Sequence, residues 1–248
     1  MPRQAREKSR TGIYHIMLRG INRQTIFEDE EDSLKFLETL KFYKAISGYN
    51  IFAYCLMSNH IHILLQVGKE DLDLIMKRIA GSYVYWYNWK YYRKGHLFQD
   101  RYKSEPVEDE KYFLTVLRYI HQNPQKAGMV KDLGAYKFSS YNEILKENKE
   151  LIDVDFVYSL IHRDDFIPFC NERNDDRCLE YDESDGRLSD ADAIKVIQKI
   201  SKCKNASEFS KLEVKKRDQC ISKLKEEGLS IRQISRLTGI SFGIVRRL

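Results

Sequence analysis

The sequence predicts an α+β fold followed by a small, separate all-α domain. Short apolar strands alternate with helical patterns along residues 1–147, which is typical of a sheet with packed helices. The charge then changes twice. Residues 163–192 carry eleven acidic side chains against four arginines, and residues 193–248 carry fourteen Lys and Arg against five acidic side chains. We therefore expect one domain at 1–147, an acidic linker with some helix at 148–192, and a basic helical domain at 193–248.

The first half of the sheet is marked by clear starts and stops. We expect a strand at Tyr14–Arg19, a helix at Glu30–Ser47 ending at Gly48, and strands at Ile51–Met57 and His60–Val67. The two residues between these last strands, Ser58-Asn59, suit a tight hairpin turn.

The second half continues the alternation. A helix capped by Asp71 is expected to reach about Arg93, followed by a loop and a fourth strand within Gly95–Lys103. A helix at Glu110–Gln122 should stop there, because Pro124 disfavours helical geometry at the residue before it. This order of elements is close to a ferredoxin-like antiparallel sheet with packed helices.

Composition narrows the class of protein. The five cysteines are odd in number and form no C-x-x-C pair, which argues against a disulfide scaffold or a zinc ribbon. No apolar run approaches the ~18 residues of a membrane span, and the basic N-terminus does not resemble a signal peptide, so a cytoplasmic protein is expected. A net charge of +5 with 16 tyrosines leans toward nucleic acid as the partner.

Two histidines stand two residues apart on the third strand. His60 and His62 share one face of that strand, whereas Ile61, Ile63 and Leu65 share the other. Two imidazoles on one face can hold a divalent ion if a third ligand comes from elsewhere. His15, on the first strand, is expected to be a core residue or one that supports a ligand.

A second pair of polar residues lies on the last helix of this domain. Tyr119 and Asn123 are four residues apart and therefore occupy one helix face. If that face meets the two histidines, imidazole and amide ligands would suit Mg²⁺ or Mn²⁺. Such an ion would help the phenol, a weak nucleophile, to attack a phosphodiester.

These motifs resemble the HUH superfamily of single-strand DNA nucleases. His60-Ile61-His62 matches its His-hydrophobe-His motif, and the flanking pattern looks like the single-tyrosine transposases of the IS200-like type, especially the REP-associated tyrosine transposases. The matching segments occur in the order of the family and are Tyr14–Gly20, Met57–His62, Gly95–Ser104, Tyr119–Pro124 and Phe138–Tyr141.

The resemblance implies roles for four of these residues. Tyr119 would be the nucleophile, and His60, His62 and Asn123 would hold the metal ion. Related insertion-sequence enzymes use a glutamine as the third ligand, so the adjacent Gln122 is the alternative to Asn123. The resemblance also implies single-stranded DNA near a hairpin as the substrate and a 5′-phosphotyrosine intermediate, with the oligomeric state, monomer or homodimer, left open.

Basic and aromatic residues are candidates for DNA contacts. Four basic side chains near the motifs are predicted to hold the DNA backbone: Arg19, Arg23, Arg101 and Lys103. The aromatic segment 83–94 is interpreted either as a helix face packed on the sheet or as exposed rings that stack on unpaired bases, with Lys90, Arg93 and Lys94 beside phosphates.

The C-terminal part has the pattern of a helix-turn-helix over about residues 218–248. Helices are expected at Asp218–Glu227, Ile231–Leu237 and Phe242–Leu248, with Gly239 in the tight turn. The recognition helix would present three polar or basic side chains to DNA, namely Ser241, Arg246 and Arg247. The alternative is a plain helical hairpin used for packing or dimerisation.

Together these features predict a metal-dependent tyrosine transposase or a related single-strand DNA endonuclease and ligase. Two alternatives remain open. One is a non-catalytic regulator that binds DNA hairpins with the same fold, and the other is a metal-dependent phosphodiesterase that uses water and leaves no covalent adduct.

Overall fold

The computed structural model describes residues 6–180, 188, 190–203 and 205–248. These residues belong to two units, which we describe one at a time. The first unit comprises residues up to 21 and 25–180, and the second comprises residues 22–24 and those from 181 onward. Residues 181–187 and 189 of the predicted acidic linker lie outside the described part of the chain.

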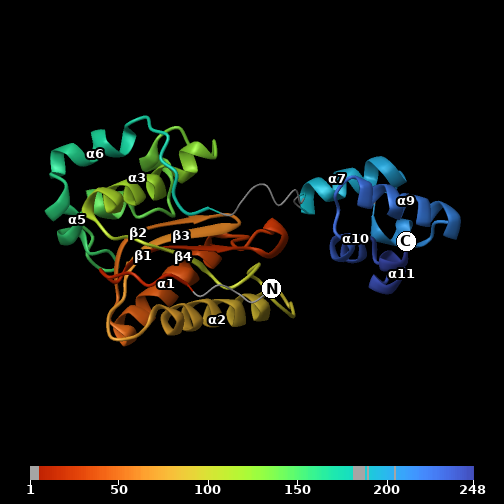
Figure 1. Ribbon diagram of the computed structural model, residues 1–248, viewed down its shortest axis with the longest axis horizontal. Coiled ribbons are helices and arrows are strands. Elements are labelled where there is room, and N and C mark those ends of the chain that lie inside the picture. Colours follow the sequence, from red (N-terminus) through yellow and green to blue (C-terminus); the bar gives the residue numbers. More distant parts are fainter. Residues whose placement is uncertain (1–5, 181–187, 189, 204) are drawn as a thin grey trace. The chain divides into compact units, whose positions relative to one another are not determined.

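An antiparallel sheet forms the centre of the first unit. The described residues give it four strands in the order β2-β3-β1-β4, with β1 at Ile13–Arg19, β2 at Asn50–Met57, β3 at His60–Gln66 and β4 at Lys103–Pro106. Helices α1 (Glu30–Ser47) and α2 (Leu72–Lys90) cover one face, and α3 (Glu110–Lys126) covers the other (Figure 1). The predicted antiparallel sheet with packed helices is confirmed, and the elements up to β4 follow the β-α-β-β-α-β order.

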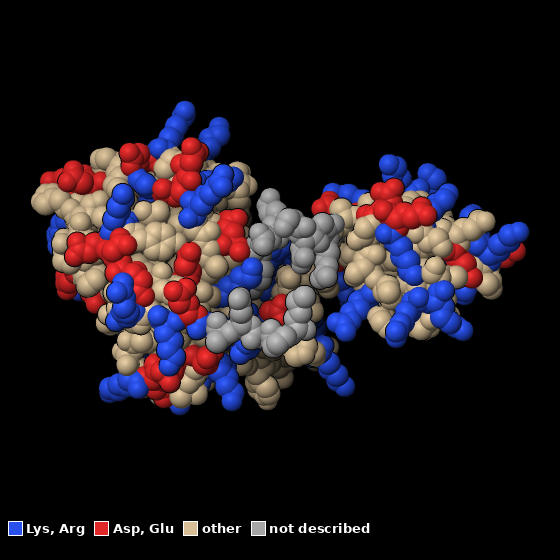
Figure 2. Space-filling model, viewed as in Figure 1, with Lys and Arg blue, Asp and Glu red and all other residues tan. Residues whose placement is uncertain are grey.

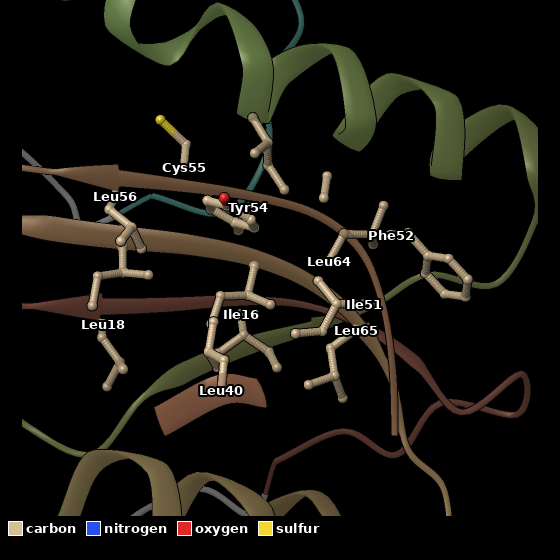
Figure 3. Packing of buried hydrophobic residues seen from close by; sticks show 14 of the residues in the cluster. Ile16, Leu18, Leu40, Ile51, Phe52, Tyr54, Cys55, Leu56, Leu64 and Leu65 are labelled. Atoms are coloured by element: carbon tan, nitrogen blue, oxygen red, sulfur yellow. The ribbon is translucent and has the colours of Figure 1, made fainter. Parts of the chain in front are cut away.

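The alternation of side chains along the strands divides the core into two layers. Ile16 and Leu18 are buried on the α1 side of the sheet beside Leu40, whereas Cys55 points to the α3 side (Figure 3). Cys55 pairs with His62 across β2 and β3, so His62 also lies under α3. The sheet therefore presents its histidines to the helix that carries Tyr119.

Helix α3 is longer than predicted. Pro124 does not end it, and the helix runs on to Lys126, where the Ala127 N–H still bonds to the Asn123 carbonyl at 2.9 Å. Proline removes only one backbone donor, and here it does so in the last turn, where the buried ring packs against the unit. The stop signal is instead Gly128, whose φ of 70° suits the residue after a helix.

The fourth strand was placed too early in the sequence. β4 begins at Lys103, where the predicted segment ended, and Gly95–Tyr102 is mostly loop. The apolar residues of that segment, Leu97, Phe98 and Tyr102, are buried in the core from the loop. Their burial explains why the pattern resembles a strand.

Residues 127–180 add short helices to the first unit. They are η2 (Leu133–Ala135), α4 (Tyr141–Leu145), α5 (Val154–Leu160) and α6 (Arg163–Asn171). Val154, Val157, Phe166 and Cys170 are fully buried in the same core as the sheet. This unit thus extends to Glu180, well beyond the expected boundary at 147.

The second unit is helical in its described residues. Its helices are α7 (Asp190–Ser201), α8 (Ala206–Ser210), α9 (Val214–Glu226), α10 (Ile231–Thr238) and α11 (Phe242–Arg247). Ile234, Ile240 and Val245 are buried in its core, and Gly239 ends α10 with a φ of 74°. Basic side chains spread over its visible face (Figure 2). Among the described helices of the whole chain, none is long and apolar enough to cross a membrane.

Candidate functional site

The two histidines of β3 lie side by side at the start of the strand. His62 is fully buried, and the centroids of its ring and the His60 ring are 5.2 Å apart at an interplanar angle of 87°. His60 Nδ1 lies 2.7 Å from Asn59 Oδ1 in the preceding turn. The tight turn between β2 and β3 therefore fixes one ring, and the sheet interior fixes the other.

Helix α3 brings Tyr119 and Asn123 to these histidines. The Tyr119 ring packs edge-on against His62, with centroids 5.6 Å apart. The Asn123 side chain lies close enough to His60 and the Tyr119 hydroxyl to influence the pKa of both groups, and its Nδ2 donates to the Tyr119 backbone carbonyl at 3.2 Å. All four residues that the resemblance assigns to catalysis therefore meet at one place between β3 and α3.

Gln122, the alternative third ligand, is engaged elsewhere. Its Nε2 donates to the carbonyl oxygens of Cys170 at 2.8 Å and Glu172 at 2.9 Å, and its Oε1 accepts a bond from Asn174. These contacts tie α3 to the segment after α6. Asn123, one residue further along the helix, is the amide that contacts His60.

The imidazoles of the site are neutral near pH 7. Burial, followed by the positive charge of Arg19, lowers the pKa of His60 to about 4. Burial also lowers the pKa of His62 well below its usual range, with His15 and His60 contributing. A neutral imidazole keeps a lone pair for a metal ion, so protons do not compete with a cation here.

The donor set fits a divalent ion. His62 Nε2 is buried and has no hydrogen-bond partner among the described residues, so this nitrogen is available to bind a metal ion. Within the described residues no three His, Cys, Asp or Glu side chains form a group that could hold a metal ion. The third candidate ligand here is an amide, that of Asn123. Two imidazoles with an amide oxygen leave positions for water and phosphate, as an open catalytic site requires.

The sequence did not predict a carboxylate that contacts the candidate nucleophile. The Tyr119 hydroxyl donates a hydrogen bond to Glu180 Oε1, and burial together with this carboxylate raises the pKa of Tyr119 above its usual range. Arg118 anchors the segment that precedes Glu180 through ion pairs with Glu172 and Asp176. Glu180 belongs to the acidic stretch that was interpreted as a linker, and no local motif distinguishes it.

Two of the predicted backbone contacts lie beside the site. Arg19 on β1 is opposite His60 on β3, and its positive charge lowers the pKa of His60. Lys103 on β4 is opposite Met17 on β1, and its Nζ lies 3.4 Å from the Glu180 carbonyl oxygen. Arg101 is exposed in the loop before β4. Arg23 ends the short helix η1 (Ile21–Arg23) with a φ of 58°.

Lys90, which was predicted to lie beside phosphates, forms ion pairs within the first unit. Its Nζ lies within 2.9 Å of carboxylate oxygens of Asp29, Glu31 and Asp32, and the side chain is 17% exposed. The sequence could not indicate this, because α1 and α2 meet only in the folded chain. Lys90 therefore joins α2 to the N-terminus of α1.

The other residues of the aromatic segment divide between core and surface. Tyr83 and Tyr87 are buried, which matches the packed helix face, and Arg93 lies over the Tyr87 ring at 5.5 Å. Three rings project outward from the end of α2 with large exposed fractions, namely Tyr85 (79%), Trp89 (71%) and Tyr92 (98%). The packed-face interpretation is therefore confirmed for Tyr83 and Tyr87, and base stacking by the exposed rings stays a prediction.

In the second unit, the predicted recognition residues are accessible. Ser241 precedes α11 as its N-cap residue, and Arg246 and Arg247 are exposed in its last turn. Ile231, Leu237 and Ile244 are half-buried against the apolar core of this unit. The short helices thus present basic side chains on a small apolar core.

Comparisons with known proteins found similarity over part of the first unit. Residues 8–123 match the profile of the family described as "Transposase IS200 like". This part of the first unit is therefore similar to the IS200-like transposase domain, and the resemblance expected from the motifs is confirmed.

Two relatives make the comparison more specific. A curated REP-associated tyrosine transposase of Haemophilus influenzae is 28% identical over 106 residues, which cover 38% of this chain and 60% of that protein. The chain thus spans about three-fifths of the length of this relative. The solved structure of a REP-associated tyrosine transposase bound to a REP hairpin aligns with a TM-score of 0.51 and 18% identity, over 62% of this chain and 90% of that one, and shows the same fold.

Proposed function

We propose that this chain is a tyrosine transposase or a related single-strand DNA endonuclease that cuts single-stranded DNA near hairpins and can rejoin it. The observation that carries the proposal is the meeting of Tyr119, His60, His62 and Asn123 in one place. These residues supply a nucleophile and three metal ligands. The hairpin substrate is suggested by the hairpin-bound solved structure.

The reaction that this geometry supports is a transesterification. The Tyr119 oxygen would attack a phosphorus atom of the DNA backbone and form a bond to it, while the bond to the 3′ oxygen breaks and releases a 3′-hydroxyl. The product is a 5′-phosphotyrosine, and attack by a 3′-hydroxyl in the reverse direction rejoins strands without ATP. Glu180 Oε1 is the group that receives the hydrogen bond of the phenol, and it is therefore the first acceptor for its proton.

His60, His62 and Asn123 would hold Mg²⁺ or Mn²⁺. When bound, the ion would polarise a non-bridging phosphate oxygen and stabilise the charge that develops there. The buried residues keep water away from the Tyr119 side chain, which is 4% exposed. Arg19, Arg101 and Lys103 would neutralise the DNA backbone as it approaches.

The exposed rings of α2 would bind unpaired bases of the same DNA. Stacking needs an exposed aromatic face and tolerates any base; Tyr85 and Trp89 of α2 and Tyr92 just after it supply three such faces near Arg93 and Lys94. We further propose that α10 and α11 form a helix-turn-helix that binds duplex DNA through Ser241, Arg246 and Arg247.

Covalent capture of DNA tests the catalytic assignment. Wild-type protein with Mn²⁺ and a 3′-labelled hairpin oligonucleotide should yield a labelled protein band on a denaturing gel, and Tyr119→Phe should yield none while binding the DNA normally. Tyr141→Phe is the matched control, because Tyr141 is equally buried at 4% exposure but packs against His121 and Phe166. Capture by Tyr119→Phe would refute the nucleophile.

The same gel separates the alternative functions. Cleavage without an adduct in the wild type would identify a phosphodiesterase that uses water. Tight binding with neither cleavage nor adduct would identify a non-catalytic hairpin-binding regulator.

A further inference from the structure

We propose that His15 is a positioning residue that holds His62 in the tautomer whose Nε2 lone pair faces the metal ion, and that Glu105 orients His15 in turn. The inference rests on the proposed metal site.

The three side chains form a row across three strands. Glu105 on β4 is directly opposite His15 on β1, and His15 is the diagonal neighbour of His62 on β3. His15 Nε2 lies 2.9 Å from His62 Nδ1, and the ring centroids are 5.1 Å apart. Both rings are fully buried, so no solvent replaces this contact.

The direction of the hydrogen bond follows from the groups at the two ends of the row. Glu105 Oε2 is the charged group that faces His15 Nδ1; at 3.9 Å the two atoms are not hydrogen-bonded, and the negative charge alone favours a proton on that nitrogen. A neutral His15 with its proton on Nδ1 has a lone pair on Nε2 and must accept the bond. His62 Nδ1 therefore donates, and His62 Nε2 keeps its lone pair.

Glu105 is itself held in place. Its Oε2 accepts hydrogen bonds from the Tyr112 hydroxyl at 2.6 Å and from the Leu179 N–H at 3.1 Å. Two nitrogens of the row have no hydrogen-bond partner among the described residues: His15 Nδ1, which faces Glu105, and His62 Nε2, whose ring lies beside that of Tyr119. Partners of this kind fix the tautomer of metal-binding histidines and typically contribute about 10–100-fold to metal affinity.

Nitrogen-15 NMR of histidine-labelled, metal-free wild-type protein tests the tautomer directly. We expect His62 to carry its proton on Nδ1 and to show an unprotonated Nε2, and His15 to carry its proton on Nδ1. Assignment follows from the loss of one signal set in His62→Gln. A proton on His62 Nε2 in the wild type would overturn the inference whether or not the protein binds metal.

Mn²⁺ affinity, measured by calorimetry without DNA, tests the consequence. His15→Leu removes the acceptor and should weaken Mn²⁺ binding about 10–100-fold. His15→Gln places an amide oxygen near the position of Nε2 and should restore the affinity to within about threefold, because the acceptor is retained. Equal affinities in the wild type and His15→Leu would also overturn the inference.

Cys55→Ala is the matched control for packing. Cys55 is the fully buried neighbour of His62 on its other side, and its thiol contacts Met57 and not the imidazole. This variant should bind Mn²⁺ like the wild type. If wild-type protein binds no Mn²⁺, the proposed metal site fails, and the NMR result decides the tautomer separately. If His15→Leu does not fold, the inference is tested by the wild-type NMR spectrum and by the Mn²⁺ affinity of His15→Gln.

Discussion

Replacing Lys90 with Met should destabilise the first unit without weakening its binding to single-stranded DNA. Lys90 lies in the aromatic, basic segment that predicts DNA contact, but its ammonium group is enclosed by three carboxylates at the N-terminus of α1. Methionine keeps the aliphatic part of the side chain and removes the charge. The variant therefore separates a structural role from a DNA-binding role.

The expected loss comes mainly from one of the three ion pairs. The Asp32 side chain is fully buried, and removing one partner of a buried ion pair costs about 3–5 kcal/mol. Asp32 keeps hydrogen bonds from the Tyr91 hydroxyl and from two backbone N–H groups, so we expect a smaller loss of about 2–3 kcal/mol. Asp29 and Glu31 are at least half exposed, and their pairs add little.

Urea unfolding measures the loss, and fluorescence anisotropy with a single-stranded oligonucleotide measures the affinity. Lys94→Met is the matched control, because Lys94 lies four residues further on and is exposed. It should leave the free energy of unfolding unchanged and should weaken DNA binding, more so at low salt. If Lys90→Met weakened DNA binding as Lys94→Met does, with no loss of stability, the structural role of Lys90 would be wrong.

Three further predictions concern pH, the third ligand and DNA binding. Burial lowers the pKa of His121 to about 3, so between pH 7 and pH 5 the unfolded state gains a proton that the folded state does not, and the free energy of unfolding should fall by about 2 kcal/mol through this group. In urea titrations with chelator present, His121→Gln should lack that part of the fall; the same fall in both proteins would contradict the assignment. Asn123→Ala should weaken Mn²⁺ binding by about 10-fold or more in calorimetry. Asn123→Asp should restore binding and Gln122→Ala should leave it intact, whereas the opposite pattern would make Gln122 the ligand. Trp89→Ala should weaken binding to single-stranded DNA by about 1–3 kcal/mol in anisotropy titrations, because the ring is exposed and available to bases. Unchanged affinity would assign that ring to another surface.

The elements with complete local signals are the ones that the sequence predicts best. Helix α1 has the predicted bounds because Asp29 and Asp32 form a capping box at its start and Gly48, with a φ of 68°, ends it. The faces of β3 are also as predicted, since alternation along a strand depends on nothing outside it. Both signals are contained within a few consecutive residues.

What the sequence could not predict depends on contacts between distant residues. The register of β1 against β3 sets His15 beside His62, and the register of β1 against β4 sets Glu105 beside His15. The residues of α5 and α6 are polar enough to resemble a linker, although Phe166 and Cys170 are fully buried. The position of Glu180 beside Tyr119 depends only on the path that the chain takes after α6.

Pro124 links the prediction that was wrong to the site that was predicted well. If α3 had ended at Gln122, Asn123 would have left the helix and lost its place one turn from Tyr119. Because the helix continues, Asn123 stays in phase, and its Nδ2 donates to the Tyr119 carbonyl at 3.2 Å. The same amide contacts His60. The site that joins Tyr119 to the histidines therefore depends on helical backbone at Asn123, the residue before the proline. Helical geometry is disfavoured at that position, and burial of Pro124 offsets this local cost.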